Sequence, residues 1–155
     1  MIVPLNLPQA KLKLTREQGQ LLVWCVVRKK KLVLTPEEWV RQHVIHFLMS
    51  EKNVPLGLIA SELSIQIHQL NRRSDVVVFG KDQHPKLVVE CKAPEVALSD
   101  NTMHQIAHYN LKLNVDYLWI TNGIQHGIFK INRTENVLEQ LDELPPFETF
   151  ARQSI

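Results

Sequence analysis

The chain has 155 residues, 45% of them hydrophobic and 22% charged, with a formal net charge of +2. These values are normal for one folded domain, and no apolar run approaches the roughly 18 residues that cross a membrane. Residues 1–4 lack the features of a signal peptide, so a cytoplasmic location with no membrane partner is expected. The small net charge permits nucleic-acid binding without indicating it, because that would require a strongly basic face.

A β-hairpin is predicted at the start of the chain. Residues 11–14 alternate between polar and apolar, and residues 21–27 form an apolar run, with Gly19 in the turn between them. The basic run at residues 28–31 could contact phosphates, but a solvated bend is the preferred interpretation. Cys25 lies in the apolar run and, like Cys91, is expected to be a buried thiol.

A helix is predicted to start at Thr35. Thr35 is a good N-cap, Pro36 suits the first helical position, and Glu38 completes a capping box. Apolar residues then recur at helical spacing, and the helix is expected to end near residues 52–53.

Three strands are predicted next, over residues 58–67, 75–79 and 86–92. The last two are expected to form a hairpin around the turn at residues 81–85. Pro94 stops the ladder of hydrogen bonds.

A second helix is expected from Ser99 or Asp100 to about Leu113. A further hairpin follows, with strands at 116–121 and 125–131 around the strong turn signal Asn122-Gly123.

The order of elements predicts an α/β or α+β layered domain with a mixed sheet. It forms one unit over residues 1–155. Within it, 1–34 is an N-terminal β extension, 35–133 is the core, and 134–155 is a tail with one or two short helices.

Asp75, Glu90 and Lys92 are the strongest candidates for chemistry. Asp75 opens one apolar strand, and Glu90 and Lys92 close the next, where alternate residues share a face. Two carboxylates can hold Mg²⁺ and leave positions open for water and phosphate, and a lysine can position the attacking water. The alternative is a turn aspartate and a surface ion pair.

The sequence resembles the nuclease core in the N-terminal domain of the type I restriction enzyme R subunit. The matching segments are residues 73–79 and 87–94, the Gln-x-x-x-Tyr element at 105–110, the strand-turn at 121–123, and the opening helix at 35–42. Together they span about residues 35–131.

This resemblance implies a PD-(D/E)XK, restriction-endonuclease-like fold and Mg²⁺-dependent cleavage of DNA, with Mn²⁺ as a substitute. It implies that Asp75 and Glu90 bind the metal with the backbone carbonyl of Cys91, and that Lys92 is the catalytic lysine. A helix glutamate commonly completes such a site. The family's Glu-x-x-(Val/Thr)-Arg pattern begins at Glu37, so Glu37 is preferred and Glu38 is assigned to the cap.

The resemblance places Gln105 and Tyr109 near the cleft as DNA contacts or supports for Lys92; ordinary helix packing is the alternative. Arg73, with Arg72 before it, could meet phosphate, and Glu62 could be an accessory. A zinc pair at His104 and His108 is disfavoured, because no third ligand accompanies it.

The sequence departs from the family in two ways. Ser74 replaces the proline of the family motif, and no Gly-x-x-x-x-Gly-Lys-Ser/Thr motif for a motor is present. The chain is therefore interpreted as the nuclease portion alone, a standalone relative or an excised piece. Two hypotheses remain: a DNA endonuclease, or a catalytically silent or partner-dependent binding module. Expected partners are DNA and other restriction or defence subunits, and the N-terminal hairpin is a candidate surface for homo-oligomers.

Overall fold

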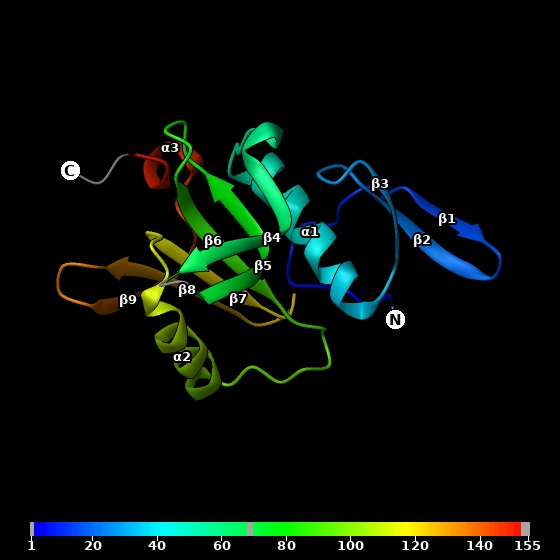
Figure 1. The fold of residues 1–155 in the computed structure, drawn as a ribbon. Helices are drawn as coiled ribbons and strands as arrows, with labels where there is room; N and C mark the ends of the chain where they lie inside the picture. The colour runs from blue at the N-terminus through cyan, green and yellow to red at the C-terminus, as the bar shows by residue number, and fades with distance from the viewer. Residues whose placement is uncertain (1, 68–69, 153–155) are drawn as a thin grey trace.

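The protein is described here from a computed structural model that covers residues 2–67 and 70–152; for residues 63–67 and 70–74 it describes the backbone only. Two sheets are present, a three-stranded sheet in the order β1-β2-β3 and a six-stranded sheet in the order β4-β5-β6-β7-β8-β9. Figure 1 shows the smaller sheet projecting to one side of the larger one, next to helix α1.

The N-terminal sheet confirms the predicted hairpin and adds a strand to it. β1 (Leu14–Glu17) and β2 (Gln20–Cys25) are antiparallel. The turn residues Gln18 and Gly19 both have positive φ, at 51° and 79°, as a tight two-residue hairpin turn requires. β1 starts later than the alternation at residues 11–14 predicts. β3 (Lys30–Val33) contains two of the lysines for which the sequence predicts a bend, so that prediction is wrong for Lys30 and Lys31.

Helix α1 (Pro36–Glu51) starts and ends where the sequence predicts. Thr35 Oγ1 accepts a hydrogen bond of 3.0 Å from the backbone N–H of Glu38, which is the expected N-cap. Lys52 is the C-cap, and Asn53 follows with a φ of 59°. The cap is therefore local, whereas the rest of the helix is held by packing.

The large sheet is antiparallel except between β6 and β7, which are parallel. Its strands are β4 (Ile59–Ile67), β5 (Leu70–Phe79), β6 (Pro85–Cys91), β7 (Tyr117–Thr121), β8 (His126–Asn132) and β9 (Val137–Leu141). A parallel pair needs a crossover, and α2 (Asp100–Tyr109) with the 3₁₀ turn η2 (Asn110–Lys112) supplies it.

Helices cover both faces of this sheet, which explains its apolar strands. Val76 and Val78 pack under α1 and the short α3 (Phe147–Phe150), whereas Val77 faces α2. Figure 1 shows α1 and α2 on either side of the sheet, and the buried hydrophobic clusters on its two faces include residues of β5, β6, β7 and β8. The mixed, layered fold expected from the sequence is confirmed.

Several details differ from the sequence predictions. β5 begins at Leu70, so Asp75 lies within this strand and does not open it. α2 ends at Tyr109, not near Leu113, and the tail contributes the edge strand β9 besides α3. In the second hairpin, Asn122 Oδ1 accepts hydrogen bonds from the backbone N–H groups of Ile124 and Gln125, so the turn spans four residues. Across residues 2–67 and 70–152, none of the helices has the length and apolarity that a membrane crossing requires.

Candidate active site

Asp75 lies in β5 at a point where α1 and β6 both reach it. Its Oδ2 atom accepts a hydrogen bond of 2.8 Å from the backbone N–H of Cys91, and its Oδ1 atom accepts one of 3.0 Å from Nη2 of Arg41. The side chain is 22% exposed. The carboxylate is therefore fixed in orientation while part of it still reaches solvent.

The strand register places Glu90 next to Asp75. Val76 is paired with Val89, and continuing this antiparallel register by one residue sets Asp75 opposite Glu90. Opposite residues in a sheet direct their side chains to the same face, with Cβ atoms roughly 4.5–5.5 Å apart. The hydrogen bond from Cys91 to Asp75 independently puts the carboxylate against the Glu90–Cys91 peptide.

Lys92 follows directly after β6. Its backbone N–H donates to the carbonyl of Thr121 at 2.8 Å, which extends the contact with β7 beyond the end of the strand. Since alternate residues share a face, Lys92 projects on the side of Glu90. Cys91 points the other way into the core under α1, where it is 2% exposed.

The Cys91 thiol is unsuited to metal ligation. Burial is the largest influence and raises the pKa of this thiol, and the negative charge of Asp75 raises it further. A thiol must lose its proton to bind a metal. A metal contact from Cys91 would therefore have to come from its backbone carbonyl, which is the role that the resemblance implies.

Arg41 joins three carboxylates at this point, and no role was assigned to it from the sequence. Its Nη2 atom donates to Glu37 at 2.7 Å and to Asp75 at 3.0 Å, and its Nη1 atom donates to Glu38 at 2.5 Å. Burial acts to lower the pKa of Arg41, but the charges of Glu38 and Asp75 outweigh it and raise the pKa above its ordinary value. The guanidinium is therefore always charged.

The two helix glutamates have different surroundings. The side chain of Glu38 is 9% exposed and bonds to Arg41 and to Nε2 of Gln42, whereas that of Glu37 is 46% exposed. The capping interpretation of Glu38 holds for its backbone N–H but not for its carboxylate, which is directed into the buried cluster. Buried charge needs a partner, and Arg41 is that partner.

Glu62 occupies the neighbouring position on β4. The pairs on either side of it set Glu62 opposite Asp75, and Glu62 has a φ of 55°, in the left-handed region that residues other than glycine rarely adopt. Its carboxylate accepts a hydrogen bond of 2.6 Å from Nη1 of Arg28. Glu62, Asp75 and Glu90 thus form one row across three adjacent strands.

The other residues predicted from the sequence lie on α2 and in the N-terminal part of β5. Gln105 and Tyr109 are on the solvent side of α2, where Tyr109 is 74% exposed, and a DNA-contact role for either residue stays a prediction. The side chains of Arg72 and Arg73 fall outside the described residues. His104 packs edge-on against Phe129, with ring centroids 5.3 Å apart.

The donors near Asp75 match the chemistry of a magnesium ion. Among the described residues, no group of three or more His, Cys, Asp or Glu side chains is placed to enclose a metal. Mg²⁺ does not require such a cage, because it is commonly bound by one or two carboxylates plus water and substrate phosphate.

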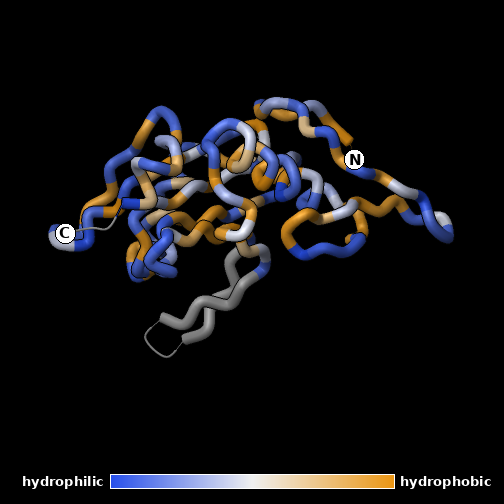
Figure 2. Tube along the Cα trace, turned by 90° about the horizontal axis from the view of Figure 1, so that it is seen from above, coloured by the Kyte–Doolittle hydropathy of each residue, from blue (hydrophilic) through white to orange (hydrophobic). Residues whose placement is uncertain are grey.

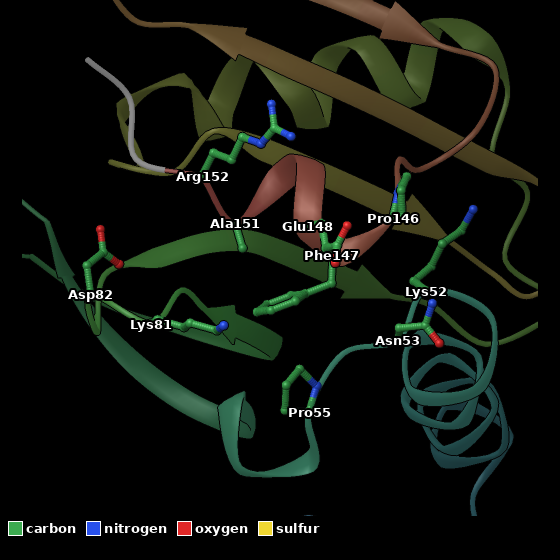
Figure 3. A pocket seen from close by; sticks show the side chains of 10 residues that line it. All are labelled: Lys52, Asn53, Pro55, Lys81, Asp82, Pro146, Phe147, Glu148, Ala151 and Arg152. Atoms are coloured by element: carbon green, nitrogen blue, oxygen red, sulfur yellow. The ribbon is translucent and has the colours of Figure 1, made fainter.

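A hollow in the surface lies elsewhere on the molecule. It has a volume of about 850 Å³ and is lined by Lys52, Lys81, Phe147 and neighbouring residues of the β5–β6 turn and α3, as Figure 3 shows. Asp75 is four residues along β5 from Phe79, roughly 13 Å from that turn. The hollow is therefore separate from the carboxylate row.

A mixed sheet between helices, with an aspartate on one strand and Glu-x-Lys at the end of the next, defines a restriction-endonuclease-like domain. Residues 36–145 match the family described as Type I restriction enzyme R protein N terminus. That match covers more than half of the sequence, so the chain belongs to this family.

One solved structure supports the same fold. It is a fragment of a protein assigned as an HsdR subunit of a type I restriction enzyme from Vibrio vulnificus YJ016, with a TM-score of 0.51 and 18% sequence identity. The similarity covers 76% of this chain and 24% of that one. No curated protein matches the sequence significantly.

Proposed function

We propose that this domain hydrolyses phosphodiester bonds in DNA with the help of a divalent metal ion. The observation that carries the proposal is the fixed carboxylate of Asp75 against the Glu90–Cys91 peptide. Together with the strand register, this contact supports a site in which Asp75, Glu90 and Lys92 share one face of the sheet. The membership in the type I restriction enzyme R protein family supports DNA as the substrate.

Asp75 and Glu90 would hold the ion, with the Cys91 carbonyl and Glu37 as further oxygen donors. Mg²⁺, or Mn²⁺ in its place, lowers the pKa of bound water and offsets charge on the phosphate when it is bound. Arg41 keeps Asp75 and Glu37 in position. Lys92 can hydrogen-bond the attacking water or the phosphate oxygens, because its ammonium has three donors.

Gln105, Tyr109 and Arg73 are proposed to contact the DNA around the cut. Gln105 is exposed and Tyr109 is 74% exposed, which supports this assignment. Their contribution would be binding, since neither residue can supply the metal or the nucleophile. Other restriction or defence subunits remain proposed partners.

The second candidate is a silent or partner-dependent DNA-binding module. The position of Arg41 favours it, because the guanidinium occupies Oδ1 of Asp75 and neutralises a charge that would attract the metal. In this case a partner subunit or the DNA would have to shift Arg41 before the metal binds. The chain also spans only 24% of the solved protein it resembles.

Cleavage of supercoiled plasmid and of single-stranded DNA in Mg²⁺, Mn²⁺ or EDTA tests the proposal. We expect cutting with either metal and none in EDTA. Asp75→Asn should abolish cutting, whereas the exposed Asp142→Asn should leave it unchanged. Metal binding without cutting would favour the silent module, and cutting that survives Asp75→Asn would indicate a contaminating nuclease.

A further inference from the structure

The basic side chains of this protein are concentrated in the N-terminal sheet. Residues 1–35 contain seven of the 18 lysines and arginines but one of the 16 acidic residues, Glu17. Residues 36–145, the part that matches the family, lie in the acidic remainder. The net charge of +2 is therefore the sum of a strongly basic extension and an acidic core.

Most of these cations are free to meet a ligand. Lys11, Lys13, Arg16, Lys29 and Lys30 are exposed and have no ion-pair partner among the described residues. Lys31 is also exposed and pairs with Glu17 at 2.7 Å. In Figures 1 and 2, the β1–β2 hairpin projects from the body of the protein and its far end is hydrophilic.

One aromatic side chain lies between the cations. Trp24 is paired with Lys31 on β3, and its backbone N–H donates to the carbonyl of Lys13. Continuing the β1–β2 register by one residue sets Lys13 opposite Trp24. Lys13, Trp24 and Lys31 therefore form a row on one face, and Trp24 is 37% exposed on it.

The opposite face anchors the sheet to the core. Val23 is fully buried and clusters with Leu34 and with Trp39 of α1. Arg28, in the turn between β2 and β3, pairs with Glu62, which stands opposite Asp75. The basic sheet is thus held in a fixed position next to the carboxylate row.

We infer that the three-stranded N-terminal sheet binds the phosphate backbone of duplex DNA and holds it next to the Asp75 row. Charge complementarity selects the occupant, since neutralising phosphates with lysines releases counterions and drives binding. A duplex is favoured over a single strand because its charge density is higher and because a single exposed aromatic gives no run of stacking platforms. The inference deepens the proposed function but does not require catalysis.

Binding in EDTA separates this surface from the nuclease proposal. Fluorescence anisotropy of a labelled duplex should be measured with the full chain and with Lys11→Ala/Lys13→Ala, across about 50–200 mM salt. We expect about tenfold weaker binding near 100 mM salt and a salt slope smaller by about 2, one per lysine. The matched control is Lys81→Ala/Lys130→Ala, which removes two exposed lysines of the core and should bind as the wild type does.

Trp24 offers a second readout. Trp39 and Trp119 are 9% and 2% exposed, so acrylamide should quench mainly Trp24. Duplex DNA should shield that fluorescence, and Trp24→Phe should remove the shielded component. Three results would overturn the inference: equal DNA binding by Lys11→Ala/Lys13→Ala and wild type, an equal loss of DNA binding in the Lys81→Ala/Lys130→Ala control, or tighter binding of single-stranded DNA. So would a wild-type dimer that already shields Trp24 without DNA.

Discussion

The Nη2 atom of Arg41 lies 3.0 Å from Oδ1 of Asp75, although 34 positions separate the two residues in the chain. This ion pair joins α1 to β5 at the point where the catalytic carboxylates are proposed. It has two consequences. It fixes the orientation of Asp75, and it removes negative charge from the site, so the same contact bears on stability and on metal affinity.

Arg41→Ala should lower the free energy of unfolding by about 3–5 kcal/mol, because Glu38 would remain buried without its partner. Urea unfolding followed by circular dichroism measures this loss. The control is Arg133→Ala, which removes a 40% exposed arginine paired with Asp116 and should cost less than about 1 kcal/mol. A loss of under about 1 kcal/mol for Arg41→Ala would show that the buried cluster contributes little to stability.

Glu38→Gln and Glu37→Gln should separate structure from metal binding. Glu38→Gln removes a buried charge paired with Arg41 and should destabilise the fold by about 3 kcal/mol. Glu37→Gln, at a half-exposed carboxylate, should cost less than about 1 kcal/mol but weaken Mn²⁺ binding in calorimetry. Unchanged Mn²⁺ affinity in Glu37→Gln would exclude that residue as a ligand.

Lys92→Ala should reduce the rate of DNA cutting at least about 100-fold while leaving Mn²⁺ binding close to wild type. The reason is that an ammonium group can donate hydrogen bonds but cannot ligate a metal. Plasmid nicking and calorimetry on the same preparation measure both properties. Loss of metal binding in Lys92→Ala would mean that this lysine supports the site structurally.

His126 should make the fold less stable in mild acid. Burial lowers the pKa of His126 below its ordinary value of 6.5, although its contact with the carbonyl of Asn6 acts in the opposite direction. Its Nδ1 lies 2.8 Å from Oγ1 of Thr121 and 3.3 Å from Nε1 of Trp119, which can only donate, so in the neutral ring Nδ1 accepts and Nε2 donates to Asn6. Protonating Nδ1 would place its N–H against the Trp119 N–H and would require the Thr121 hydroxyl to turn and accept.

The direction in which pH changes the free energy of unfolding follows from proton linkage. Because the unfolded state takes up the proton first, the contribution of His126 is complete above pH 6.5 and is lost as the pH falls below that value. Urea unfolding at about pH 7.5 and 5.5 should show this fall, and His126→Gln should reduce it. His84→Gln, at an exposed histidine, should leave it unchanged. An equal pH dependence in wild type and His126→Gln would contradict the assignment.

Much of the fold could be predicted because its signals are local. The Thr35 cap and the turn at Gly19 depend on residues within a few positions of each other, and both are confirmed. β9 was not predicted because an edge strand with exposed polar residues shows no clear alternation. β3 was not predicted because its lysines resemble a bend, and only pairing with β2 makes it a strand.

The candidate site could likewise be predicted only in part from the sequence. Asp75, Glu90 and Lys92 were marked by their position next to apolar runs, although Asp75 lies inside β5 and not at its start. Their catalytic roles remain predictions. The role of Arg41 could not be read from the sequence, because it depends on a contact between α1 and β5. Two signals were available: the Glu-x-x-(Val/Thr)-Arg pattern that begins at Glu37 ends at Arg41, and Arg41 follows Glu37 and Glu38 by four and three residues. That spacing is common on helix surfaces and says nothing of burial.

The β5–β6 hairpin contains an extra residue between its turn and the carboxylate row. Val78 pairs with Leu87 and Phe79 pairs with Pro85, so Lys86 has no pairing partner on β5. Side chains alternate between faces, so the site depends on the register on the row side of this bulge. Removing Lys86 alone would convert the bulge into a regular ladder in which Phe79 still pairs with Pro85 and Asp75 stays opposite Glu90. The bulge therefore lets the hairpin lose one residue near its turn without moving the carboxylate row.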